Sequence, residues 1–143
     1  MIARSLAFSL LTALASLALP SCDGTPTIPA SSDPTGKDLV EGAVVAMVSD
    51  ADGTPGYRIY KVLHVDDYPQ PVGTNLHLEV FDPKMPGYPE LARARKRGQL
   101  SVLLPHFEIR LVDFIGRDHR VLDVEPLTKA ETAAYEKGRD RRR

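Results

Sequence analysis

The chain has 143 residues, of which 43% are apolar and 26% charged, with a formal net charge of -1, one cysteine and no tryptophan. This length fits one small domain, and the composition excludes a collagen, a coiled-coil rod and a multi-domain enzyme. A lone cysteine excludes an intrachain disulfide and a four-thiolate metal site, so the fold must be held by its core. The near-neutral charge argues against a nucleic-acid-binding surface, and we expect no nucleic-acid partner.

Residues 1–21 have the layout of a secretory signal peptide. Arg4 supplies a short positive start, residues 5–19 are apolar and uncharged, and Pro20 ends the apolar stretch. This stretch is shorter than the roughly 20 residues that a membrane-spanning helix needs, so cleavage is favoured over a retained span. We therefore predict export and removal of residues 1–21.

The only cysteine follows directly, in Leu19-Pro20-Ser21-Cys22, which resembles the lipobox of bacterial lipoproteins. The resemblance implies that Cys22 receives a diacylglycerol on its sulfur and becomes the acylated N-terminus. Two or three acyl chains attach a protein stably to a membrane, since each buried CH₂ contributes about 0.8 kcal/mol. Cys22 is thus the predicted lipidation site, and it would anchor the chain at the bacterial cell envelope, facing the periplasm or the exterior. The alternative is an ordinary signal peptide that ends near an unpaired thiol.

The rest of the chain divides by composition into three parts. Residues 22–37 are rich in Pro, Gly, Ser and Thr and hold one large apolar residue, Ile28, which predicts a flexible tether after the lipidated Cys. Residues 38–137 form a single predicted globular domain, and residues 138–143 form a basic tail.

Short apolar runs and alternating patterns predict five strands in the domain. These strands are expected at residues 44–48, 57–65, 75–81, 106–114 and 120–124. A dense group of turn residues at 49–56 joins the first two strands and predicts a hairpin. The Pro-start and Gly-stop pattern of residues 89–97 and Gly98 predicts one inserted helix. Thr128 and Glu131 have the spacing of a capping box, which predicts a closing helix that runs to Gly138.

These elements favour an α+β fold with a small, mostly antiparallel and strongly bent sheet or a partly open SH3-like barrel, with one inserted and one C-terminal helix. The order of segments 57–63, 76–78, 104–107 and 125–128, followed by a Glu- and Tyr-bearing helix, looks like small bacterial proteins of SH3-like build, some of them considered immunity or accessory proteins of toxin systems. The resemblance carries over no functional residue.

A hairpin of the second and third strands would place His64 opposite His77. In the expected register, Leu63 lies beside Leu78 and Val65 beside Leu76. Two imidazoles at this spacing are close enough to share a divalent metal, with Glu79 or Asp66 as a third ligand. The alternative is a surface or hydrogen-bonded histidine pair, and we predict no cofactor.

The same register would place Tyr60, Val62 and Phe81 on the face of the two histidines. That arrangement predicts a partly exposed aromatic patch of the kind that marks partner sites. The alternative is that these side chains pack in the core.

No motif in the sequence supports catalysis. Asp66 and Asp67 are adjacent on a strand, so their side chains point in opposite directions. Ser101 and His106 lack the spacing of a nucleophile elbow, and no phosphate-binding or zinc-protease motif occurs. We therefore predict that the chain is not an enzyme.

Two basic clusters end the predicted helices, at residues 93–97 and 137–143. They are suited to anionic headgroups or to an acidic partner, or they serve as favourable cations at helix C-termini. The leading hypothesis is a lipid-anchored, non-catalytic binding or accessory module at the cell envelope, with the membrane and an unidentified protein as partners. The alternatives are an envelope-held immunity or inhibitor protein, which would present an acidic or aromatic sheet face to a basic toxin, and a small metal-binding protein or hydrolase that uses His64 and His77.

Overall fold

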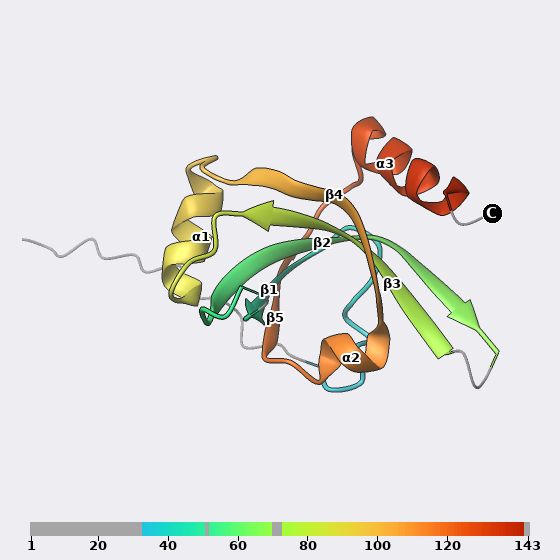
Figure 1. The fold of residues 1–143 in the computed structure, drawn as a ribbon, viewed down its shortest axis with the longest axis horizontal. Helices are drawn as coiled ribbons and strands as arrows, with labels where there is room; N and C mark the ends of the chain where they lie inside the picture. The colour runs from blue at the N-terminus through green and yellow to red at the C-terminus, as the bar shows by residue number, and fades with distance from the viewer. Residues whose placement is uncertain (1–32, 51, 70–72, 142–143) are drawn as a thin grey trace, which may run out of the picture.

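A computed structural model describes residues 33–50, 52–69 and 73–141 of the chain (Figure 1). The predicted signal peptide, Cys22 and most of the predicted tether lie outside the described residues. The elements are β1 (Ala43–Ser49), β2 (Gly56–Tyr68), β3 (Gly73–Asp82), α1 (Tyr88–Lys96), β4 (Ser101–Arg110), α2 (Leu111–Ile115), β5 (His119–Val124) and α3 (Lys129–Asp140).

The strands form one antiparallel sheet in the order β4-β3-β2-β1-β5, with β4 and β5 at its edges. Strands β2, β3 and β4 curve strongly, but the sheet does not close into a barrel (Figure 1). The predicted small α+β domain with a mostly antiparallel sheet is therefore confirmed.

The two predicted helices are present with nearly the expected bounds. Helix α1 begins one residue before Pro89 and is followed by Gly98, whose positive φ of 65° suits glycine. Helix α3 begins at the predicted capping box, in which the Thr128 side chain accepts from the Glu131 N–H and the Glu131 carboxylate accepts from the Thr128 N–H. It continues through Gly138 to Asp140, so the predicted basic tail begins inside the helix.

One predicted element is wrong in part, because the strand expected at 106–114 ends at Arg110 and gives way to helix α2. Leu111, Phe114 and Ile115 have helical spacing, and all three pack into the main core, where Phe114 is fully buried. The alternating pattern of the strand runs directly into this helical pattern, so the sequence shows no break between them.

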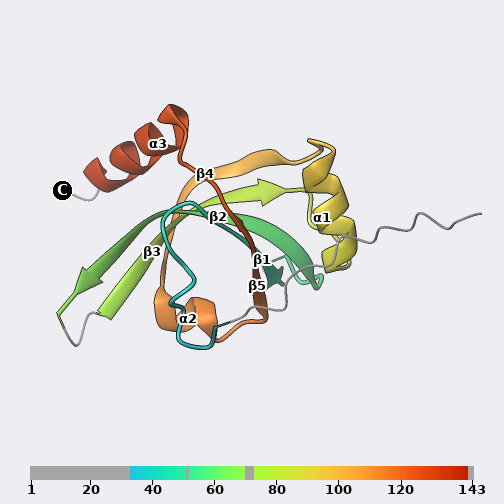
Figure 2. The ribbon, with the colours of Figure 1, turned by 180° about the vertical axis from the view of Figure 1, so that it is seen from behind.

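The sheet has a different cover on each face (Figure 2). The main core lies between the sheet and helix α2, with Leu39 of the N-terminal segment packed into it. On the opposite face, Tyr88 and Leu91 of α1 pack over Val44 and Ile59. Helix α3 lies near the other end of the sheet from α1 and places Glu131 over Lys61 and Tyr135 over His77. Helices α1 and α3 therefore cover different parts of one face.

A β-bulge in β2 decides which side chains meet α3. His64 pairs with His77 and Val65 with Leu76, as predicted, but Leu78 pairs with Val62 because the register shifts between Val62 and His64. The expected pairing of Leu63 with Leu78 is wrong, since Leu63 is the extra residue of the bulge.

The bulge also overturns the predicted aromatic patch. Tyr60 and Val62 are buried in the main core together with Leu78, whereas His64 contacts Tyr135 of α3 on the opposite face. Phe81 packs against the smaller core beside α1. Because one extra residue reverses the side-chain alternation, the expected patch is split between the two faces.

Candidate functional site

Three histidines from neighbouring strands lie under helix α3. His64 is on β2, His77 on β3 and His106 on β4, and His77 is buried between the other two. The Tyr135 ring of α3 lies 4.7 Å from the His64 ring and 5.0 Å from the His77 ring, measured between centroids. The helix is therefore in direct contact with the histidine cluster.

Asp66 joins two of the histidines. Its Oδ2 lies 2.9 Å from His77 Nε2 and its Oδ1 lies 3.3 Å from His64 Nε2, while the Tyr68 hydroxyl donates to Oδ2. Burial raises the pKa of Asp66, but the hydrogen bonds from His77 and Tyr68 outweigh it and hold that pKa below its ordinary value. The carboxylate thus stays ionised and fixes the two imidazoles.

The hydrogen bonds continue from His77 to His106. Because Asp66 is an ionised acceptor, His77 Nε2 donates to it. The other ring nitrogen, Nδ1, lies 2.9 Å from His106 Nε2, within hydrogen-bond distance. Glu108 Oε2 lies 3.8 Å from the same His77 nitrogen. The hydrogen-bonded series therefore runs from Asp66 through His77 to His106.

The backbone of α3 covers the far side of His106. A Cβ placed on Gly138 would lie 2.3 Å from His106 Nδ1, so only glycine lets the helix approach the ring this closely. A substrate approaching Nδ1 from this side would meet the helix. This arrangement suits a role in positioning α3 better than one in acid or base catalysis.

A second polar cluster fixes the start of α3. Lys61, which is 4% exposed, donates from Nζ to Glu131 Oε1 at 2.8 Å and Oε2 at 3.0 Å, and to the Pro126 carbonyl at 3.2 Å. Glu131 is itself buried, and no other residue of α3 is. The helix therefore docks on the sheet through this ion pair and through the contacts of the Tyr135 ring with the histidine rings, rather than through an apolar stripe.

Glu79 completes this cluster on β3 and is also buried. Burial and the nearby negative charge of Glu131 raise the pKa of Glu79 to about 7, against the lowering effect of Lys61. Around neutral pH, Glu79 is therefore partly protonated and hydrogen-bonded to Glu131. The contact between α3 and the sheet thus includes a group that titrates near pH 7.

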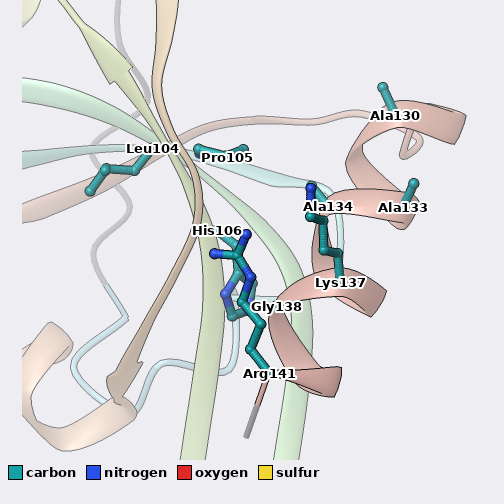
Figure 3. A pocket seen from close by; sticks show the side chains of 9 residues that line it. All are labelled: Leu104, Pro105, His106, Ala130, Ala133, Ala134, Lys137, Gly138 and Arg141. Atoms are coloured by element: carbon teal, nitrogen blue, oxygen red, sulfur yellow. The ribbon is translucent and has the colours of Figure 1, made fainter.

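A groove of about 640 Å³ separates α3 from strand β4 (Figure 3). Its apolar walls come from β4 and the first half of the helix, and its basic end from the last turn of the helix. It is lined by Leu104, Pro105, His106, Ala130, Ala133, Ala134, Lys137, Gly138 and Arg141. Within the described part of the chain, Lys137 and Arg141 take part in no ion pair. The groove therefore combines apolar surface with two cations available to a ligand.

The structure brings the predicted metal candidates His64 and His77 together, but Glu79 lies in the separate cluster with Glu131. His77 Nε2 is hydrogen-bonded to Asp66 Oδ2, and His64 Nε2 lies 3.3 Å from Asp66 Oδ1. Among the described residues, no group of three or more His, Cys, Asp or Glu side chains is arranged to hold a metal ion. Asp66 and Asp67 do point to different partners, since Asp67 accepts from Thr74 instead.

The predicted lipidation site, Cys22, lies outside the described residues. No helix in the described ranges has the length and apolar character needed to cross a bilayer. A comparison with protein-family models, curated proteins and solved structures finds no match for this chain.

The sequence analysis missed His106, Tyr135 and the partnership of Lys61 with Glu131. His106 and Tyr135 each stood within a predicted element, but only the bulge in β2 and the docking of α3 bring them to His77. The available signal for Lys61 was a lysine surrounded by Ile59, Tyr60, Val62 and Leu63 in a strand pattern, because a buried lysine needs an acidic partner.

Replacing Glu79 tests the titration of this cluster. The pKa of Glu79 is raised from 4.5 to about 7, so the folded state binds its proton more tightly than the unfolded state. The stability from this group is fully present below pH 4.5 and is lost as pH rises through about 7. We expect Glu79→Gln to remove this loss, so that between pH 5 and 8 the wild-type free energy of unfolding falls by about 2 kcal/mol relative to the variant.

Urea denaturation across this pH range measures the difference. Glu136→Gln, at an exposed position of the same helix, makes the same change of charge and should leave the wild-type pH dependence unaltered. Parallel pH profiles for wild type and Glu79→Gln would show that Glu79 does not titrate in this way.

Proposed function

We propose that this chain is a bacterial lipoprotein that acts as a non-catalytic binding module at the cell envelope. In this proposal, residues 1–21 are removed, Cys22 is lipidated, and the domain faces the periplasm or the exterior on a short tether. The groove between α3 and β4 then takes an acidic segment of a protein partner. The resemblance to small SH3-like accessory proteins belongs to the same proposal.

The single observation that carries the binding role is the groove itself. Leu104, Ala130 and Ala134 give it an apolar wall, while Lys137 and Arg141 make no ion pair among the described residues. Apolar surface next to such cations favours a partner that supplies both apolar and acidic side chains. A basic partner would be repelled by the same two cations.

The arrangement of the histidines favours binding over chemistry. His77 uses both ring nitrogens in hydrogen bonds to Asp66 and His106, and Gly138 covers His106 Nδ1. The immunity alternative requires an acidic or aromatic sheet face, but Tyr60 is buried in the core and Glu79 lies beneath α3. The metal alternative requires His64 and His77 as ligands, but each ring already directs one nitrogen at Asp66, and the other nitrogen of His64 lies 3.3 Å from Glu41 Oε2. We therefore propose neither alternative.

The lipid anchor is tested by replacing Cys22. We expect the wild-type protein to lack residues 1–21, to carry acyl chains by intact-mass measurement, and to partition with membranes. Cys22→Ser removes the only thiol and therefore the acyl chains attached to it. Without these chains the protein should move into the soluble envelope fraction, because stable membrane attachment requires them. Wild-type protein that keeps residues 1–21 with an unmodified thiol would contradict the proposed anchor.

The groove is tested by reversing its charge. Wild-type protein and the double variant Lys137→Glu/Arg141→Glu are used to capture partners from detergent-solubilised envelopes. We expect the wild type to capture one partner in stoichiometric amount and, after chemical cross-linking, the groove to be joined to an acidic segment of that partner. Capture should fall at least about tenfold with the double variant, because each charge pair in an interface contributes roughly 1 kcal/mol or more.

Lys129→Glu is the matched control, since Lys129 lies on the same helix but does not line the groove. It should keep the partner. Equal capture by wild type and by the double variant would show that the groove is not the binding surface.

A further inference from the structure

Strand β4 forms one edge of the sheet. It pairs with β3 on one side, and in the described structure no strand lies along its other side. An edge of this kind presents backbone N–H and C=O groups that can pair with an additional strand. The groove described above runs beside this strand, because Leu104 and Pro105 belong to both.

The side chains of β4 are unusually apolar for an exposed edge. Val102, Leu103 and Leu104 are 49%, 44% and 43% exposed, and Phe107 is 39% exposed. Consecutive residues of a strand point to opposite faces, so apolar surface is exposed on both sides of this edge. Proteins usually protect an exposed edge with charges or a cover, whereas an edge that receives a partner strand keeps such apolar positions.

The chemistry of the groove changes along β4. In Figure 3, Ala130 lies at the end of the helix nearer Leu104 and Pro105, Lys137 extends toward Ala134, and the Arg141 side chain reaches His106. A strand paired with the outer edge of β4 would direct every second side chain toward this groove. Apolar side chains fit its first part and carboxylates its second part.

We propose, building on the proposed function, that the acidic segment of the partner adds to the outer edge of β4 as a sixth strand. Its backbone pairs with Ser101–Leu104, since Pro105 has no N–H to donate. Its apolar side chains cover Leu103 and Leu104, and its carboxylates lie against Lys137 and Arg141. Main-chain hydrogen bonds supply affinity in this binding mode, and the groove supplies selectivity.

The charge distribution favours this occupant over a second copy of the chain. Two β4 strands paired antiparallel would bring the start of one strand beside the end of the other. Helix α1 ends at Lys96, shortly before β4 begins, and Lys137 and Arg141 lie beside its later part. Basic groups of the two copies would therefore approach each other, which is unfavourable.

Binding of defined peptides to the full chain in detergent tests the proposal. The first probe is a labelled short peptide in which every second residue is Val in one half and Glu in the other, with Thr between them, so that one face of the strand carries both the apolar and the acidic side chains. The second has the same sequence with N-methyl groups on the backbone nitrogens of one edge, and the third has Lys in place of Glu. Fluorescence anisotropy gives the affinities, and hydrogen exchange reports protection of the β4 amides.

We expect the acidic peptide to bind and to protect β4 amides from exchange, and both other peptides to bind at least about tenfold more weakly. Leu103→Asn should weaken binding of the acidic peptide. Val124→Asn, at an exposed position of the opposite edge strand β5, should not.

If the N-methylated peptide binds as tightly as the acidic peptide, strand addition is overturned. The proposed function would still stand, because the capture experiment with Lys137→Glu/Arg141→Glu tests it separately. Failure of the acidic peptide to bind would overturn the proposal as well. So would a chain that sediments as a dimer and becomes a monomer with Leu103→Asn, because a second copy would then occupy the edge.

Discussion

The buried ion pair between Lys61 and Glu131 is the interaction on which the position of helix α3 depends. Glu131 begins the helix through the capping box with Thr128 and, with the same carboxylate, accepts two hydrogen bonds from Lys61. One residue thus both starts the helix and attaches it to the sheet. Loss of either partner would leave the other buried without its main counter-charge, and breaking a buried pair in this way typically costs about 3–5 kcal/mol.

The groove between α3 and β4 follows from this attachment. With Glu131 fixed over β2, the next turns of α3 place Tyr135 on His64 and His77, and Gly138 on His106. These contacts set the spacing between α3 and β4 that forms the groove. Because α3 buries little apolar surface, ionisable groups hold one wall of the groove, and Glu79 makes that attachment responsive to pH near neutrality.

Local sequence signals predicted much of the fold. Alternating residues located most of the strands, and the capping box fixed the start of α3, because both depend on neighbouring residues. The end of β4 and the existence of α2 were missed, since Leu111 and Phe114 continue an apolar pattern that suits a strand as well as a helix. Tertiary contacts, which the local pattern does not contain, decide between a strand and a helix for these residues.

The site was less predictable for a related reason. The His64–His77 pairing followed from the hairpin, but the bulge at Leu63 reversed the faces of the residues before it. No pattern in the sequence predicted that bulge. The partnerships of Lys61 with Glu131 and of His77 with His106 join residues far apart in the chain, so they depend on the docking of α3 and on strand order.

Hydrogen exchange of the α3 amides in Lys61→Met tests most directly whether the ion pair holds the helix that forms the groove. Lys84→Met is the control, because Lys84 pairs with the half-exposed Asp52 away from α3. We expect at least about tenfold faster exchange in α3 of Lys61→Met, with the core strands β1 and β2 unchanged and the control like the wild type. Unchanged protection of α3 in Lys61→Met would contradict the dependence of the helix on this ion pair.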